Sequence, residues 1–181
     1  AMLVTHISAA AGSLAWMAME WKKFGKPSAL GIATGMVAGL GTITPASGFV
    51  SPAAALVIGL SAGVICFYMV IFVKHKLKID DSLDVFPVHG IGGILGTLLA
   101  GVFASTELGL FSGYGFAKPE YTMLDQLGVQ ALGVVATFVY TALVTWVLLK
   151  LIGLFAPLRV TGDEETQGLD IALHEERGYD L

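Results

Sequence analysis

Long apolar runs separated by short polar segments dominate this sequence of 181 residues. The hydrocarbon core of a bilayer is about 30 Å thick, and a helix of roughly 20 apolar residues can cross it. Only 13% of the residues are charged and 55% are hydrophobic, whereas soluble domains contain about 25% charged residues. We therefore predict an all-α polytopic membrane protein rather than the core of a large soluble protein. The five predicted transmembrane helices cover residues 2–19, 29–46, 52–73, 81–104 and 126–156.

The positive charges predict the orientation of these spans. Nine of the ten Lys and Arg residues lie near the ends of the first, third and fifth runs or in the tail, and only Lys118 falls on the opposite side. By the positive-inside rule, the amino end is outside and residues 157–181 form a cytoplasmic tail below a transmembrane bundle over 1–156. The fifth run would form a helix about 45 Å long. We expect it to tilt, to bend at Gly133 or Gly153, or to project beyond the bilayer.

Composition also limits the chemistry of the chain. A net charge of -4 without a basic block does not favour a nucleic-acid partner. The single Cys66 excludes an internal disulfide and a cysteine-based metal site, and we predict that it packs in the interior. The first residues contain no basic segment and no small-residue cleavage site, so we expect no signal peptide, and a piece of a longer protein is one interpretation.

Glycines spaced four residues apart predict close helix packing. Gly31, Gly35 and Gly39 form such a series, and the pairs 59/63 and 92/96 repeat it in the next two runs. In lipid no hydrophobic force drives helices together, so close backbone approach and dispersion must do so. The series therefore predicts a tight bundle rather than separate membrane anchors.

The second run ends in the sequence TITPASG at residues 42–48. Pro45 lacks an N–H group and disfavours helical structure at Thr44. Backbone groups released inside a membrane need protein or water partners. A helix end beside a wet vestibule and an ordinary helix end at the membrane surface both fit this pattern.

His89 is the one His, Lys, Arg, Asp or Glu residue well inside the second to fourth runs. It follows Asp81 by eight residues, about 12 Å of helix, which is near mid-bilayer if the span begins at Asp81. An ionisable residue there indicates a functional site, because a neutral imidazole can both donate and accept a hydrogen bond. The alternative is a buried histidine bonded to a backbone carbonyl. We find no nucleophile motif or paired metal-ligand spacing around it, and we predict neither enzyme activity nor a cofactor.

Acidic residues precede the fourth run and recur in the tail. Asp81 and Asp84 favour the positive end of a helix dipole, and Asp81 or Ser82 could cap that helix. The same carboxylates would also surround the cytoplasmic mouth of a neighbouring pore. The acidic tail is compatible with disorder and with docking below the bundle.

Four stretches of the sequence occur together in one known family. They are THISAAAG at 5–12 with Trp16, GLGTITPASGFV at 39–50, DDSLDVFPVHGIGG at 80–93, and a tail with LRV at 158–160, GLD at 168–170, His174 and Tyr179. In this order they resemble the carboxy-terminal half of the ammonium transporter family (Amt/Mep/Rh), nearest the bacterial and archaeal Amt branch. The resemblance implies that the runs are spans seven to eleven of an eleven-span fold, assembled as a homotrimer with one narrow pore in each protomer.

The resemblance also implies roles for single residues. His89 matches the second of two paired pore histidines, Val85 a pore-lining position, and Thr44 a position close to the pore path. Asp81 and Asp84 match acidic positions at the cytoplasmic end of the same helix. The regulatory tail of the family contacts neighbouring protomers and PII (GlnK-type) signal proteins, and its matching residues here are Gly168, Leu169, Asp170, His174 and Tyr179. The sequence departs from the family at Pro87, Glu175 and Gly178, where Gly, Gly and Ala are common.

The implied function is ammonium transport in the cell membrane. Ammonium loses a proton on entry, ammonia passes a hydrophobic pore, and the proton crosses by a histidine and water relay. The amino-terminal half would supply the partner histidine and the outer ammonium site, so we expect no transport by this chain alone. The alternatives are an ammonium sensor that signals through its tail and a Rhesus-type gas channel, against which the bacterial-style tail argues.

Overall fold

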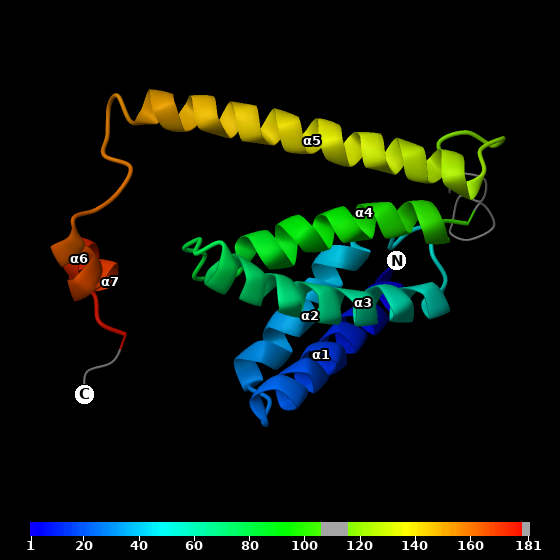
Figure 1. Ribbon diagram of the computed structural model, residues 1–181, viewed down its shortest axis with the longest axis horizontal. Coiled ribbons are helices and arrows are strands. Elements are labelled where there is room, and N and C mark those ends of the chain that lie inside the picture. The colour runs from blue at the N-terminus through cyan, green and yellow to red at the C-terminus, as the bar shows by residue number, and fades with distance from the viewer. Residues whose placement is uncertain (106–115, 179–181) are drawn as a thin grey trace. The chain divides into compact units, whose positions relative to one another are not determined.

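The computed structural model describes residues 1–105 and 116–178, and within them the regular elements are helices (Figure 1). Two compact units, Ala1–Val135 and Ala136–Leu181, divide the chain within its longest helix. The predicted boundary between a bundle ending at 156 and a separate tail stays a prediction. The elements are α1 (Met2–Phe24), α2 (Ala29–Ile43), α3 (Pro52–Ile71), the π-helices η1 (Phe72–Lys76) and η2 (Phe86–Ile91), α4 (Gly92–Phe103), α5 (Met123–Ile152), α6 (Gly162–Gln167) and α7 (Leu169–His174).

Four helical segments of the described chain are long and apolar enough to cross a membrane: Met2–Phe24, Pro52–Lys76, Phe86–Phe103 and Met123–Ile152. The remaining predicted span, residues 29–46, corresponds to α2, whose 15 residues reach about 22 Å. This helix ends at Ile43 rather than at the expected residue 46, because Pro45 supplies no N–H group to extend it. The apolar run continues beyond α2 in a series of turns over residues 44–49.

The fourth predicted span begins later than expected. We predicted a start near Asp81, but the helix begins at Phe86, and Asp84 has a positive φ of 56° that interrupts any helix there. His89 therefore lies in the first turn of this helix rather than about 12 Å along it. The fifth span is one continuous helix through Gly133 that ends at Ile152, just before Gly153.

The α1–α2 hairpin is defined by its capping groups. Gly25 ends α1 in the left-handed conformation (φ 80°), where its N–H donates to the Trp21 carbonyl at 3.0 Å. Ser28 caps α2 by accepting a hydrogen bond from the Gly31 N–H at 2.8 Å. The Glu20 carboxylate in turn accepts from the Ser28 N–H at 2.7 Å. Two helix ends and the connection between them are thus held by one local network.

Close backbone contacts join α1 to α2 and α3, as the glycine spacing predicted. A Cβ atom on Gly39 or Gly59 would overlap the Ser8 carbonyl oxygen, and one on Gly63 would lie 2.6 Å from the Gly12 carbonyl oxygen. The buried Ser8 hydroxyl donates to the Gly39 carbonyl at 2.9 Å. Gly96 of α4 meets the Thr42 carbonyl of α2 in the same way. Glycine backbone therefore forms part of the contact surfaces of these helices.

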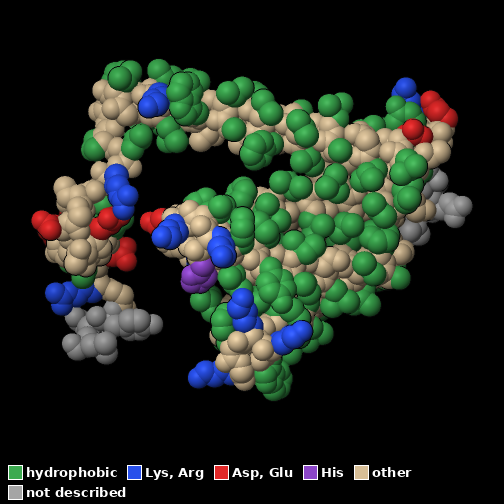
Figure 2. Space-filling model, viewed as in Figure 1, with side chains coloured by type: hydrophobic (Ala, Val, Ile, Leu, Met, Phe, Trp, Pro, Cys, Tyr) green, Lys and Arg blue, Asp and Glu red, His purple; other side chains and the backbone are tan. Residues whose placement is uncertain are grey.

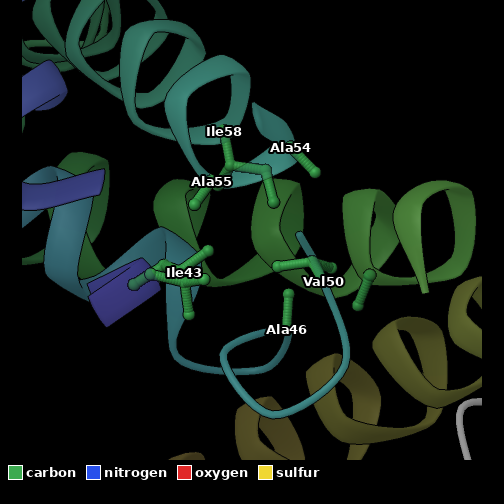
Figure 3. Close-up of a cluster of buried hydrophobic side chains, with 8 residues drawn as sticks. Ile43, Ala46, Val50, Ala54, Ala55 and Ile58 are labelled. Atoms are coloured by element: carbon green, nitrogen blue, oxygen red, sulfur yellow. The ribbon is translucent and has the colours of Figure 1, made fainter. Parts of the chain in front are cut away.

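Two clusters of buried side chains fill the space between the helices. One surrounds Ile43 and Ile58, both fully buried, at the end of α2 and the start of α3 (Figure 3). The other contains Trp16, Phe67 and Cys66, which confirms that the cysteine packs in the interior. Hydrophobic side chains also cover much of the outer surface, and Lys and Arg side chains gather near helix ends (Figure 2). This distribution is the one expected of a protein that contacts lipid.

The polar tail contains two short helices. Thr161 begins α6 with a capping box, in which its hydroxyl accepts from the Glu164 N–H and the Glu164 carboxylate accepts from the Thr161 N–H. Gly168, with φ of 94°, connects α6 to α7. The Arg159 guanidinium pairs with the Glu165 carboxylate at 2.8 Å. The described part of the tail is therefore folded locally.

Candidate functional site

His89 lies in η2, which packs against α2, α3 and α4. The preceding Pro87 and Val88 are buried, whereas His89 is exposed in this chain. Its imidazole faces the backbone of α2 at Gly41, where an added Cβ would lie 3.9 Å from the ring Nδ1. Among the described residues His89 is thus not buried, whereas its role in a pore stays a prediction.

The two other predicted pore residues lie on the elements that meet at His89. Val85 precedes η2, is 51% exposed, and stands about one helical turn before the histidine. Thr44 follows α2 and is exposed, with its hydroxyl donating to the Leu40 carbonyl at 2.7 Å. Thr44 stands three positions after Gly41, a spacing that puts both on one side of a helix. A pore role for Val85 and Thr44 stays a prediction.

Asp81 caps the helix that carries His89, which confirms the capping role that we considered for it. Its two carboxylate oxygens accept hydrogen bonds from the N–H groups of Val85 at 2.9 Å and Phe86 at 2.8 Å. These donors lie at the helix start, where no intrahelical acceptor is available. A negative charge there also interacts favourably with the helix dipole. Asp81 therefore fixes where the His89 helix begins.

Asp84 forms an ion pair that the sequence did not indicate. Its carboxylate lies 2.7 Å from the Lys74 ammonium, with the two side chains 19% and 35% exposed. Lys74 belongs to η1, so the pair joins the segments on both sides of the 77–84 loop. In the sequence, Lys74 indicates only the topology of the spans. The pairing balances the Asp84 charge, so Asp84 and Asp81 do not act as two equivalent free carboxylates.

Gly41 is the second residue that sequence reasoning missed. It lies outside the four-residue series of Gly31, Gly35 and Gly39 and so faces a different neighbour. The sequence does show that Gly41 follows Gly39 by two positions. In a helix with 3.6 residues per turn, this places Gly41 about 200° around the helix axis from Gly39. Finding the neighbour on that side required the position of η2.

The predicted tail residues lie in and around α6 and α7. Gly168 connects the two helices, Leu169 and Asp170 begin α7, and His174 ends it. Glu175, at a position where the resemblance implies Gly, has a positive φ of 54°, a conformation that glycine adopts without strain. Tyr179 lies outside the described residues. Docking of this segment on any partner stays a prediction.

No group of three or more His, Cys, Asp or Glu side chains able to hold a metal occurs among the residues that the structure describes. His6 of α1 is exposed, and its Nδ1 hydrogen-bonds to the Met2 carbonyl at 2.9 Å. The candidate site therefore consists of one accessible imidazole, a bare helix backbone beside it, and a capped helix start.

These helices, long and apolar enough to cross a membrane, define a polytopic membrane protein that carries the accessible imidazole of His89 at the start of one candidate span. The model of the Ammonium Transporter Family matches residues 1–179, and the chain belongs to this family. A relative from Methanothermobacter thermautotrophicus is 49% identical over 183 residues, which cover 100% of this chain and 44% of the relative. The ammonium transporter Amt1 of Archaeoglobus fulgidus is 43% identical over 179 residues, covering 99% of this chain and 44% of its own length.

A solved structure described as a sensor Amt protein superposes with a TM-score of 0.82 at 32% identity, covering 94% of this chain and 40% of that one. The chain therefore spans less than half the length of the relatives that it matches. Membership of a transporter family bears out the predictions of an all-α membrane protein and of a protein that is not an enzyme.

Proposed function

We propose that the complete protein containing this sequence transports ammonium across the cell membrane, with His89 in its pore. The observation that supports this most directly is the open imidazole at the start of the Phe86–Phe103 span, beside the bare backbone of Gly41. Family membership supplies the substrate class. The part of the protein outside this chain provides the other wall of the pore and the partner histidine.

The proposed mechanism follows from the cost of desolvating a cation. Transfer of ammonium into an apolar passage costs several kcal/mol, and neutral ammonia avoids most of this cost. Ammonium therefore loses its proton before the apolar section, and ammonia passes His89. A neutral imidazole can accept on one nitrogen while donating on the other, so a histidine pair with water carries the proton separately.

The proposal extends to assembly and regulation. Lys22, Lys23 and Lys26 lie at one end of α1, and Lys74 and Lys76 lie in η1, a distribution that favours a cytoplasmic location for these ends. The amino end is then outside and α6 and α7 are cytoplasmic. The complete protein forms a homotrimer in the lipid bilayer, and its tail contacts a neighbouring protomer or a PII (GlnK-type) protein.

A second candidate is an ammonium sensor that signals through α6 and α7 with little transport. The similarity to the sensor Amt protein, with a TM-score of 0.82, favours considering it. A sensor binds ammonium without net flux, whereas a transporter moves ammonium continuously down its gradient.

Ammonium flux into proteoliposomes tests the proposal. The complete wild-type protein is expected to give ammonium uptake, and His89→Ala is expected to abolish it or to alter its selectivity against potassium. The 181-residue chain alone is expected to give none. Wild-type flux and selectivity in His89→Ala would contradict the role of His89, and ammonium binding without flux would favour the sensor.

A further inference from the structure

Gly41 differs from the other glycines of α2 in what surrounds it. A Cβ atom on Gly31, Gly35 or Gly39 would overlap atoms of α1 or of its Glu20 side chain. On Gly41 the same atom would lie 3.8 Å from the Val88 carbonyl oxygen and 3.9 Å from His89 Nδ1. Both distances are ordinary van der Waals contacts, so packing of the described residues does not require glycine at position 41.

The backbone conformation does not require glycine there either. Among the described glycines, positive φ values occur at Gly25 and Gly168 and not at Gly41. Glycine inside a helix is also less favourable than alanine, because it loses more conformational freedom. What the glycine does provide is the absence of a side chain next to His89 Nδ1.

We propose that Gly41 is a specificity-determining residue that limits the size of the nitrogen base able to pass His89. This inference rests on the proposed transport function. On this inference the base passes the imidazole where the Gly41 backbone and the Val88 carbonyl lie next to Nδ1, so one added methyl group narrows the passage. Ammonia still fits beside the ring, and a base that carries a methyl group is excluded first.

Competition between ammonium and methylammonium tests this role in the complete protein. Gly41→Ala is expected to lower the ratio of methylammonium to ammonium uptake about tenfold, since one methyl group in a tight site discriminates by that order. Gly133→Ala is the matched control, because it makes the same backbone change in α5 where nothing lies within 4 Å of the new Cβ. Its uptake ratio should stay within about twofold of the wild-type ratio.

A second measurement does not depend on transport. Carbethoxylation of His89 by diethyl pyrocarbonate, followed by mass spectrometry, is expected to slow several-fold in Gly41→Ala and to stay unchanged at His6. An unchanged uptake ratio together with unchanged reactivity of His89 would overturn the inference while leaving ammonium transport intact. Failure of Gly41→Ala to assemble would also overturn it, because the observed distances leave room for the methyl group. Absence of ammonium uptake by the wild type would overturn the proposed function, and the inference with it.

Discussion

Helices α1 and α5 are both long and apolar, but they meet very different surroundings in this chain. In an apolar stretch of 18 residues in α1, 39% of the residues are buried, whereas no residue is buried in the corresponding stretch of α5. Gln126, near its start, is the one buried residue of α5. A stripe of small residues on α1 meets the glycines of α2 and α3, whereas α5 presents large apolar side chains such as Leu143 and Phe138. Apolar composition thus indicates membrane insertion, while small-residue spacing indicates contact with protein.

Substitution of a glycine at the contacts between α1, α2 and α3 should have the largest effect on assembly. Gly39→Leu is expected to prevent assembly of the complete protein, because its side chain would overlap the Ser8 backbone, which cannot move aside. Gly133→Leu in α5 meets nothing within 4 Å and should leave assembly intact. Size-exclusion profiles of both variants in detergent give the comparison. Equal loss in Gly133→Leu would mean that α5 lies against another backbone in the complete protein.

Truncation of a buried side chain should have the second-largest effect, a loss of stability. Ile58→Ala truncates a fully buried side chain and is expected to reduce the free energy of unfolding by about 2–5 kcal/mol. Leu143→Ala truncates a side chain that is 60% exposed, so its effect should be about 0.5 kcal/mol or less. Unfolding titrations of the purified protein measure both. A large loss at Leu143 would show that protein rather than lipid covers this side of α5.

The tail extends the comparison to a region outside the apolar helices. Glu175→Gly should stabilise the end of α7 by about 1 kcal/mol, because Glu175 holds a left-handed conformation with φ of 54°. Amide hydrogen exchange across residues 169–175 measures the gain. Glu175→Ala serves as the control, since alanine keeps the strain and should give no comparable protection. Equal protection in both variants would rule out backbone strain as the cause.

The smallest effect should be a pH dependence at the start of α6. Hydrogen bonds from the Thr161 hydroxyl and then from its N–H hold the pKa of Glu164 below its ordinary value of 4.5. Because the folded pKa is lowered, the stabilisation is present above pH 4.5 and is lost as the pH falls through the folded pKa. Carbon-13 NMR of the Glu164 carboxyl group follows this titration. In Thr161→Val the pKa should move back toward 4.5, and an unchanged value would contradict the assignment.

Much of the fold could be predicted because lipid imposes strong constraints on sequence. The glycine series at 31, 35 and 39 correctly predicted a close contact, since few other residues permit such backbone approach. The start of the fourth span could not be placed, because Asp81 acts across a turn whose geometry depends on the positive φ of Asp84. Periodicity carries no signal for that turn or for the π-helix that follows it.

The candidate site was only partly predictable for a similar reason. His89 stood out as an ionisable group in an apolar run, and that signal is local in sequence. The roles of Gly41 and Lys74 depend on residues distant in the sequence. Gly41 lies beside His89, 48 residues later, and Lys74 pairs with Asp84, 10 residues later. Contacts across such separations depend on how the helices pack, which the composition of each helix leaves open.

The capping network of the α1–α2 hairpin has a consequence for biogenesis. Its hydrogen bonds join residues at most eight positions apart, between Glu20 and Ser28, so they can form as soon as Ile43 has left the ribosome. Translation at about 5–20 residues per second leaves roughly 1–6 s before the end of α3 follows. Two antiparallel helices can therefore enter the bilayer as a prepaired unit, and α3 then joins a surface that already exists. The hydrogen bonds between Glu20 and Ser28 can thus hold the first two helices together before α3 arrives.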